Sequence, residues 1–480
     1  MSRIVNYPAP KGACLQHDFQ IRIREQEGKE WKNVDCYQVK VDMHEVRTAS
    51  MAYFYFTGEV ELEITCPEIF YIYQVKVRPL NAGVKADYDS KTIRIKLDRP
   101  QKLSIEVNED QFHNLHLFAG EIEEQEPDPF NDNTLYLPGS PDRVSVHRTE
   151  ELMAEAEKKP KGRTIYFGPG VHYLEECTMR IPSDTNVFLA GGSVLVGTFI
   201  VSRSENVRIF GKGCQYLAGF ERFSGLNAVR LSHARNVTVK GIHMINPPHY
   251  SVYIGGSSDI SVEDITSFSC EGWSDGIDIM SSQNISVRDC FLRTSDDCIA
   301  IYGRRWAYNG DTSHITVKNC TLWADVAHPT MIGTHGDFEQ EGNCLEDIHF
   351  EDLDILEHHE YQAEYLGCLA INAGDKNTVR NIFYEKIRIE QISHGKILDF
   401  QVKCNPDYNP EPGREIKGVS LKDIWYWGSG EVESAICGYS PLSPVTGVTI
   451  KNLYIRGKKA EDFSEAGIRV GDFTEDIVIS

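Results

Sequence analysis

The 480-residue sequence contains no apolar run long enough to cross a membrane as a helix. Its first residues, Met-Ser-Arg-Ile-Val-Asn-Tyr-Pro, also lack the apolar core of a signal peptide. We therefore expect no membrane partner and a cytoplasmic location. A secreted protein whose leader has been removed would begin in the same way, so that alternative stays open.

The chain also lacks a long basic run, and its acidic residues outnumber the basic ones. Lys and Arg together number 49 and Asp and Glu 71, which gives a formal net charge of −22. Such a chain repels polyanions, so we expect no nucleic-acid partner. The 13 cysteines are odd in number and lack the spacing of a disulfide framework, which favours reduced thiols. The sequence predicts no particular oligomeric state.

Residues 1–130 are predicted to form a β-sandwich domain. Apolar and polar residues alternate in short segments at 59–65, 71–77, 92–97 and 103–108. Turn residues separate these segments at short intervals, which is typical of a sandwich. The domain contains no catalytic constellation, so it either supports the rest of the chain or binds sugar. An acidic, proline-containing segment at 121–129 is the predicted linker.

The remainder of the chain, residues 131–480, repeats one short pattern. A polar or glycine residue is followed by apolar, any, apolar, two polar or small residues, and apolar again. The pattern occurs at 236–242, 259–265, 284–290, 314–320, 347–353, 381–387, 418–424 and 447–453. A repeat every 23 to 37 residues, rich in β-branched residues and without helical periodicity, indicates a solenoid of strands. We predict an all-β protein whose larger domain is a right-handed parallel β-helix.

The repeat also predicts a cluster of acids. A second short strand precedes several repeat segments, and each of these strands ends on an isoleucine. Stacking the strands in register places the residue four positions before each isoleucine in one column, which reads Tyr250, Asp275, Asp297, His328. Neighbouring turns lie about 4.8 Å apart, and Asp296 adjoins Asp297. The three carboxyl groups and the histidine are therefore expected to converge.

Close carboxyl groups suit glycoside hydrolysis. That reaction needs one protonated carboxyl to donate to the leaving oxygen and one ionised carboxylate to activate water or attack carbon. Like charges at short range separate the pKa values in this way. Two alternatives remain: the acids could bind Ca²⁺, or they could be structural acids that cap turns. Our main interpretation requires no cofactor and no metal.

Three segments resemble motifs of the polygalacturonase family of glycoside hydrolases in order and spacing. They are Ser-Asp-Gly-Ile-Asp at 274–278, Ser-Asp-Asp-Cys-Ile-Ala-Ile at 295–301 and His-Pro-Thr-Met-Ile-Gly at 328–333. The N-terminal sandwich and the segment 182–199 are similar to the related dextranase and isopullulanase family. The resemblance implies a pectin-lyase-like β-helix and hydrolysis with inversion. It also implies that Asp296 is the general acid, that Asp275 and Asp297 position and deprotonate water, and that His328 tunes the acid.

One departure from the polygalacturonase pattern bears on the substrate. Where that family has an Arg-Ile-Lys strand that binds a uronate, this chain has Ala370 and Asn372 in place of the two cations. Because charge-assisted bonds to a carboxylate are lost, we predict a neutral α-linked oligosaccharide or polysaccharide substrate. A polygalacturonase or exo-galacturonidase acting on pectic oligosaccharides is the first alternative, with Arg304 or Arg305 compensating. A non-catalytic glycan-binding solenoid is the second.

Several residues near the acids are predicted to bind the substrate. Two tryptophans flank the acids and are candidates for stacking on sugar rings. The full set of predicted substrate-binding residues is His249, Tyr250, Trp273, Arg304, Trp306, His335 and Asn372.

Overall fold

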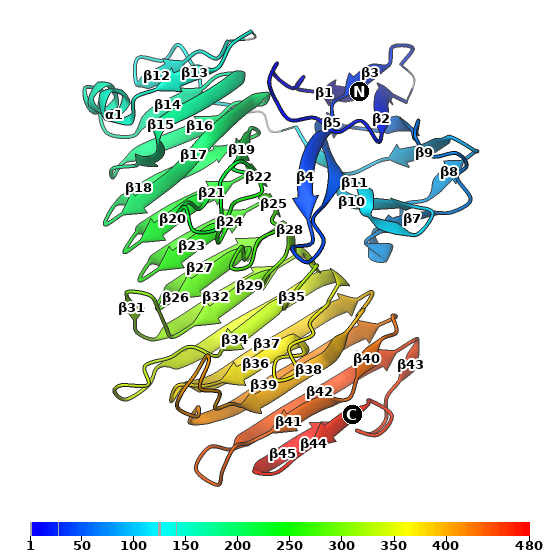
Figure 1. Cartoon of the computed structure of the whole chain (residues 1–480), viewed down its shortest axis with the longest axis vertical. Helices are drawn as coiled ribbons and strands as arrows, with labels where there is room; N and C mark the ends of the chain where they lie inside the picture. The colour runs from blue at the N-terminus through cyan, green and yellow to red at the C-terminus, as the bar shows by residue number, and fades with distance from the viewer. Residues whose placement is uncertain (1, 27, 123–125, 141) are drawn as a thin grey trace.

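The computed structural model describes residues 2–26, 28–122, 126–140 and 142–480, which form a small two-sheet domain beside a long solenoid of strands (Figure 1). Within these residues no helix is long and apolar enough to cross a membrane. The N-terminal part consists of a six-stranded and a five-stranded sheet, and their apolar residues share one core. The first sheet contains β1 (Arg3–Val5), β4 (Tyr37–Val41), β5 (Arg47–Thr57), β7 (Val75–Arg78), β10 (Gln101–Val107) and β11 (Asp110–Glu121). The second contains β2 (Gln20–Glu25), β3 (Lys32–Val34), β6 (Val60–Thr65), β8 (Ala86–Tyr88) and β9 (Thr92–Leu97), and a short 3-10 helix lies at Leu80–Ala82.

Three of the four strands predicted in this part are present as β6, β9 and β10. The fourth is shorter than predicted, because β7 begins only at Val75. The backbone amides of Tyr73 and Gln74 donate to the side chain of Asn108 instead of to a neighbouring strand. The predicted domain boundary at 130 falls between β11 and the next strand, β12. The predicted linker includes residues 123–125, which lie outside the described residues.

From Thr134 onward the strands form the predicted right-handed parallel β-helix, in which each strand pairs with its equivalents on the turns before and after (Figure 1). The first half contains β12 (Thr134–Leu137), β13 (Ser145–His147), β14 (Arg163–Phe167), β15 (Gly170–Arg180), β16 (Thr185–Leu189), β17 (Ser193–Ser202), β18 (Glu205–Gly211), β19 (Cys214–Tyr216), β20 (Val229–Ser232), β21 (Arg235–Lys240), β22 (His243–Ile245), β23 (Val252–Gly255), β24 (Ser258–Glu263), β25 (Thr266–Phe268), β26 (Ile277–Met280), β27 (Gln283–Arg288), β28 (Phe291–Thr294) and β29 (Ile299–Tyr302). The second half contains β32 (Thr312–Lys318), β33 (Thr321–Ala324), β34 (Thr330–Gly333), β35 (Cys344–Glu357), β36 (Gly367–Ala373), β37 (Thr378–Ile389), β38 (Gly395–Val402), β39 (Glu415–Tyr426), β40 (Glu431–Val432), β41 (Ser434–Cys437), β42 (Val445–Ile455), β43 (Lys458–Lys459), β44 (Ile468–Val470) and β45 (Thr474–Ile479). Helix α1 (Thr149–Glu157) contacts β14 and β15 near the N-terminal end, and a hairpin of β30 (Arg304–Arg305) and β31 (Tyr308–Asn309) projects from the middle.

The backbone conformation at the first position of the repeat explains which residues occur there. Asn236, Asp259 and Asn284 all occupy this position, and their φ angles are 52°, 58° and 57°. This left-handed conformation favours Asn, Asp and Gly over other residues. The Asn284 amide also donates to the Asp259 carboxylate on the turn before, at 3.0 Å. The repeat therefore bends the chain at the same point in each turn and keeps the turns in register.

Buried charge fixes the sandwich against the β-helix. Arg293 of the helix bonds to Asp325 at 2.9 Å and to Asn114 of the sandwich at 3.0 Å. Arg78 of the sandwich reaches Glu390 of the helix at 2.7 Å. Buried charges are tolerated only when their donors and acceptors are paired, so such contacts require a defined geometry. The two parts are therefore held in one fixed arrangement.

Candidate active site

The strand register places the predicted column of residues on successive turns. Val252, Ile277, Ile299 and Thr330 are stacked partners in β23, β26, β29 and β34. The residues that precede each strand continue the ladder: the Gly276 amide donates to the carbonyl of Asp297 at 2.8 Å, and the Cys298 amide to that of His328 at 2.7 Å. Asp275, Asp297 and His328 therefore follow one another along the helix axis.

The three carboxyl groups meet as the sequence predicts. One oxygen from each of Asp275, Asp296 and Asp297 lies within 4.8 Å of the other two. Asp275 and Asp297 are buried, whereas Asp296 is partly exposed. Two of the acids are thus enclosed, and the third faces the approach to the site.

His328 adds a positive charge to this cluster. Its Nδ1 lies 2.6 Å from Oδ1 of Asp297, and its Nε2 lies 2.8 Å from the carbonyl oxygen of Tyr365. A ring with an acceptor at each nitrogen is a donor on both sides. Burial opposes the charge, but Asp297 outweighs it and raises the pKa of His328 to about 9. The ring is therefore an imidazolium at neutral pH.

Asp296 has the properties of an acid near neutral pH. Its Oδ2 accepts the Trp273 amide at 2.7 Å, and its Oδ1 accepts the Asp297 amide at 3.0 Å. Burial and then the charge of Asp297 raise the pKa of Asp296 to about 6. Burial and then the charge of Asp278 also raise the pKa of Asp275, whose Oδ1 accepts no hydrogen bond among the described residues. Protons are therefore retained in the cluster at mildly acidic pH.

Asp278 is a fourth carboxyl that the sequence reasoning did not select. It lies in β26 between Ile277 and Ile279, is fully buried, and neither of its oxygens has a hydrogen-bond partner in the described part of the chain. Burial and then the charge of Asp297 raise its pKa. An acid between two core isoleucines must point out of the β-helix, and this alternation was the signal that could have identified it.

Aromatic rings and arginines line one side of the acids. The rings of Trp273 and Trp306, which are 38% and 49% exposed, lie 5.9 Å apart. His249 lies 6.2 Å from the first and 6.1 Å from the second. The guanidinium of Arg222 lies 4.7 Å from the ring centre of Trp273, and that of Arg305 lies 4.7 Å from that of Trp306. This wall combines flat apolar faces with positive charge.

The pKa of the histidine in this wall is lowered by burial and by the charges of nearby arginines. Burial and then the charges of Arg230, Arg305 and Arg222 lower the pKa of His249 to about 4. His249 is therefore neutral at neutral pH. The sequence reasoning named Arg305 but missed Arg222 and Arg230, because neither stands in the stacked column of acids.

Of the other predicted binding residues, Tyr250 and His335 lie close to the acids. Tyr250 is buried beside His249, and the His335 ring lies 5.0 Å from that of Tyr302, whose hydroxyl donates to Asp297 at 3.3 Å. The remaining two predicted binding residues are already engaged elsewhere. Arg304 pairs with Asp337 at 3.0 Å and with Glu339 at 2.9 Å, and the Asn372 amide donates to Asp399 at 3.2 Å. A role for Arg304 and Asn372 in substrate binding stays a prediction.

The oxygen atoms of the three aspartates would also suit a cation, as the calcium alternative requires. Calcium is coordinated by about six to eight oxygen atoms, and carboxylates commonly supply several of them. Here, however, the protonated His328 already occupies one carboxylate at 2.6 Å, and its positive charge opposes a second cation. The charge arrangement therefore favours proton transfer over metal binding.

Comparison with known proteins places these features in a family context. The family model for glycosyl hydrolases family 28 matches residues 223–468, just over half of the chain. Exopolygalacturonase B of Aspergillus niger is 21% identical over 283 residues, covering 53% of this chain and 62% of the relative. The polygalacturonase of Juniperus ashei is 27% identical over 239 residues, covering 48% and 43%. The chain thus spans less than two thirds of the length of these curated relatives.

Solved structures share the fold at low sequence identity. Dex49A from Penicillium minioluteum superposes with a TM-score of 0.61 at 14% identity and covers 99% of this chain and 96% of its own. The family 28 exopolygalacturonase of Yersinia enterocolitica superposes with a TM-score of 0.50 at 10% identity and covers 92% and 98%. At this identity the likeness concerns the fold alone, and it agrees with the predicted parallel β-helix.

Proposed function

The chain belongs to glycosyl hydrolase family 28, and from this premise we propose that it is an exo-acting, inverting glycoside hydrolase of α-linked galacturonide oligosaccharides. The convergence of Asp275, Asp296 and Asp297, with one oxygen of each within 4.8 Å of the others, carries the proposal. Asp296, with a pKa of about 6 and partial exposure, donates its proton to the leaving oxygen. Asp297, oriented by the His328 imidazolium, and Asp275 hold the attacking water on the opposite side.

Inversion is proposed from the family resemblance. Inverting enzymes usually keep the acid and base about 6.5–9.5 Å apart, so that water fits between base and sugar, and retaining enzymes keep them about 5–5.5 Å apart. The nearest oxygens here are closer than the first range. These ranges describe a pair of carboxyl groups, whereas this site has three. Two of them can bind one water molecule while the third reaches the leaving group. The stereochemistry of the product is therefore a direct test.

The arginine-rich wall supports a uronic substrate. The charges of Arg230, Arg305 and Arg222 all act on His249, and the guanidinium groups of Arg222 and Arg305 lie over the rings of Trp273 and Trp306. A galacturonide presents a sugar face to an aromatic ring and a carboxylate to a guanidinium. The names of the curated relatives favour the same substrate class. Both observations support the galacturonide alternative over the neutral glycan that the sequence first suggests.

The β30–β31 hairpin supports attack at a chain end. It folds back over the outer face of the preceding turns: the Tyr308 ring packs against Gly255, and its hydroxyl donates to Ser232 at 2.7 Å. Ser232 lies three turns before Tyr302 in the same column. A side chain at Gly255 would collide with the Tyr308 ring. The hairpin thus covers part of the outer face of the turns that precede the aspartates, and we propose that it limits how far a substrate extends in that direction.

A neutral α-glycan is the second candidate. Ala370 and Asn372 stand where polygalacturonases carry two cations, and Asn372 is bonded to Asp399. A neutral sugar needs no carboxylate partner at this position. The non-catalytic solenoid, our second alternative, predicts binding without turnover of either substrate.

The purified protein incubated with trigalacturonate, maltotriose and isomaltotriose distinguishes these functions. We expect faster release of monomer from trigalacturonate. Arg305→Met should lower kcat/KM for trigalacturonate by about tenfold or more, because a charge-assisted bond contributes about 1.5–3 kcal/mol. Arg235→Met is the matched control, since Arg235 pairs with Glu205 on the outer surface. Faster turnover of a neutral trisaccharide would support the second candidate, and turnover of none would support the non-catalytic one.

A further inference from the structure

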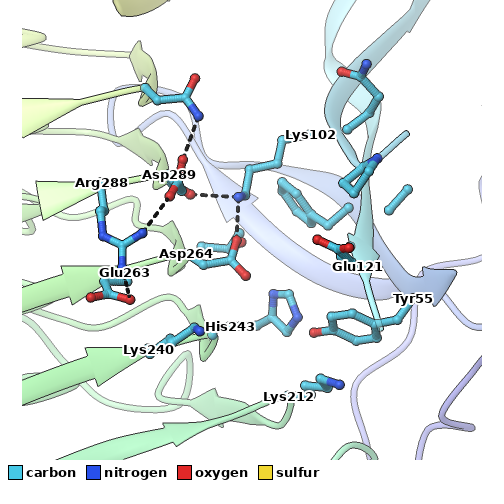
Figure 2. A pocket seen from close by; sticks show the side chains of 18 of the residues that line it. Tyr55, Lys102, Glu121, Lys212, Lys240, His243, Glu263, Asp264, Arg288 and Asp289 are labelled. Carbon is cyan, nitrogen blue, oxygen red and sulfur yellow. Dashed lines mark hydrogen bonds and ion pairs between the residues drawn. The ribbon is translucent and has the colours of Figure 1, made fainter. Parts of the chain in front are cut away.

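A cavity of about 660 Å³ lies between the sandwich and the β-helix (Figure 2). Tyr55, Lys102 and Glu121 of the sandwich line one side, and Lys240 and His243 of the helix line the other. None of the described residues that line it belongs to the aspartate cluster. In Figure 1 the sandwich and β31, which belongs to the hairpin beside the acids, lie on opposite sides of the β-helix. The cavity is therefore separate from the candidate active site.

The charges that line the cavity are balanced. The described lining residues include six Lys or Arg and six Asp or Glu. Several of them pair with one another: Arg288 bonds to Glu263 at 2.7 Å, and Lys102 bonds to Asp264 and to a backbone carbonyl at 2.6 Å (Figure 2). Paired charges keep further donors and acceptors for hydroxyl groups. Such a lining offers a polyanion no net attraction and offers a neutral polyol many hydrogen bonds.

Aromatic rings supply the apolar part of the lining. Phe188 and Phe210, stacked partners on successive turns, lie 5.1 Å apart in an edge-to-face arrangement. Phe118 and Tyr55 of the sandwich also line the cavity. Ligand cavities of about 300–1,000 Å³ typically combine apolar walls with a few polar groups. A sugar chain, with apolar ring faces and polar edges, has the matching surface.

His243 is the strongest sign of a missing ligand. His243 is the first residue of the β-helix strand β22, and its side chain is 4% exposed. The ring lies in the wall of the cavity, 4.3 Å from the ring of Tyr53 (Figure 2). Neither ring nitrogen has a hydrogen-bond partner within the described residues. Burial and then the charge of Lys102 lower its pKa to about 3, so the ring is neutral and offers one donor and one acceptor. Buried polar groups are normally paired, so a hydroxyl-bearing ligand seated against this wall is a candidate partner for the ring.

We propose that this cavity is a second carbohydrate-binding site, which takes a short neutral oligosaccharide. The site differs in charge from the arginine-rich wall beside the acids. It does not depend on the proposed hydrolysis, because its residues belong to a separate surface. A glycan held there would keep the protein close to a polymer that carries neutral as well as acidic sugars.

Calorimetric titration of the Asp296→Asn protein with maltotriose, cellotriose, galactotriose and trigalacturonate tests the proposal, because substrate is not consumed. We expect at least one neutral trisaccharide to bind, and Phe210→Ala in the same background to weaken that binding at least tenfold. Phe383→Ala is the matched control, since Phe383 is an exposed phenylalanine of the β-helix outside the cavity. His243→Phe, which keeps an aromatic ring but removes both nitrogens, should weaken binding in the same direction.

Each outcome decides the question. Neutral binding that Phe210→Ala removes and Phe383→Ala leaves intact supports the site. No neutral binding, or equal binding in both variants, overturns it, and so does a Phe210→Ala effect confined to trigalacturonate. These measurements record binding and not hydrolysis. The second binding site can therefore be disproved while the proposed hydrolase function stands, and the hydrolase function can be disproved while the binding site stands.

Discussion

Replacing Asp296 with asparagine removes the carboxyl whose pKa is best placed for proton donation. Burial and the charge of Asp297 raise that pKa from 3.8 to about 6. At pH 5 a carboxyl with a pKa of 6 is about nine-tenths protonated, whereas one with a pKa of 3.8 is only about one-seventeenth protonated. The structure therefore supplies about 15 times more of the acid form than an ordinary aspartate would.

The expected kinetics follow from this. For the native protein, kcat/KM on trigalacturonate should fall about tenfold per pH unit above pH 6, as the acid loses its proton. Asp296→Asn should lower kcat by about 10²–10⁴. The loss should be below about tenfold for a nitrophenyl glycoside, because its leaving group needs little protonation. Steady-state rates between pH 4 and pH 8 on both substrates measure these effects.

Asp375 is the matched control for this experiment. Burial also raises its pKa to about 6, yet it accepts backbone amides of Gly336 and Glu411 and is not part of the aspartate cluster. Asp375→Asn should leave both the rate and its decline above pH 6 unchanged. If Asp296→Asn kept that decline, or reduced both substrates equally, the assignment of the general acid would be wrong.

Three further perturbations test the charges around the site and at the domain contact. His328→Gln removes a positive charge that lowers the pKa of Asp296, so the decline in kcat/KM should move above pH 6 while the rate falls. An unchanged pH profile of kcat/KM would contradict this effect of His328 on Asp296. Glu357→Gln removes a buried carboxyl with a pKa of about 7 instead of 4.5. Because native stability falls as this group ionises from pH 4.5 through 7, the variant should raise the free energy of unfolding by about 3 kcal/mol at pH 8 and leave it unchanged below pH 4.5, measured by denaturant titration. Asp325→Ala leaves Arg293 buried without its carboxylate partner and should cost about 3–5 kcal/mol, whereas the surface variant Glu205→Ala should cost less than about 1 kcal/mol.

Much of the fold was predictable because every turn of a solenoid has the same geometry and therefore repeats the same local sequence pattern. The polar first position, here Asn236, Asp259 and Asn284, marks the bend of each turn, and the apolar positions mark the core. The contact between sandwich and β-helix was not predictable. Arg78 and Glu390 stand 312 residues apart, and no sequence period connects such a pair.

The candidate site likewise has a part that the sequence predicts and a part that only the folded structure reveals. The stacked column of Asp275, Asp297 and His328 followed from the repeat, because register alone sets it. Arg222 and Arg230 precede the column in the sequence, and only the folded structure brings their charges to act on His249. The cavity of Figure 2 also arises from surfaces that are distant in the sequence.

The configuration of the first product tests the central claim most directly. Proton NMR of trigalacturonate during hydrolysis, recorded before mutarotation, distinguishes the two anomers of the newly formed reducing end. Water activated by Asp275 and Asp297, with Asp296 as the acid, should invert the α-linkage and give the β anomer first. If the α anomer appeared first, one of these carboxylates would be a nucleophile and the proposed mechanism would be wrong.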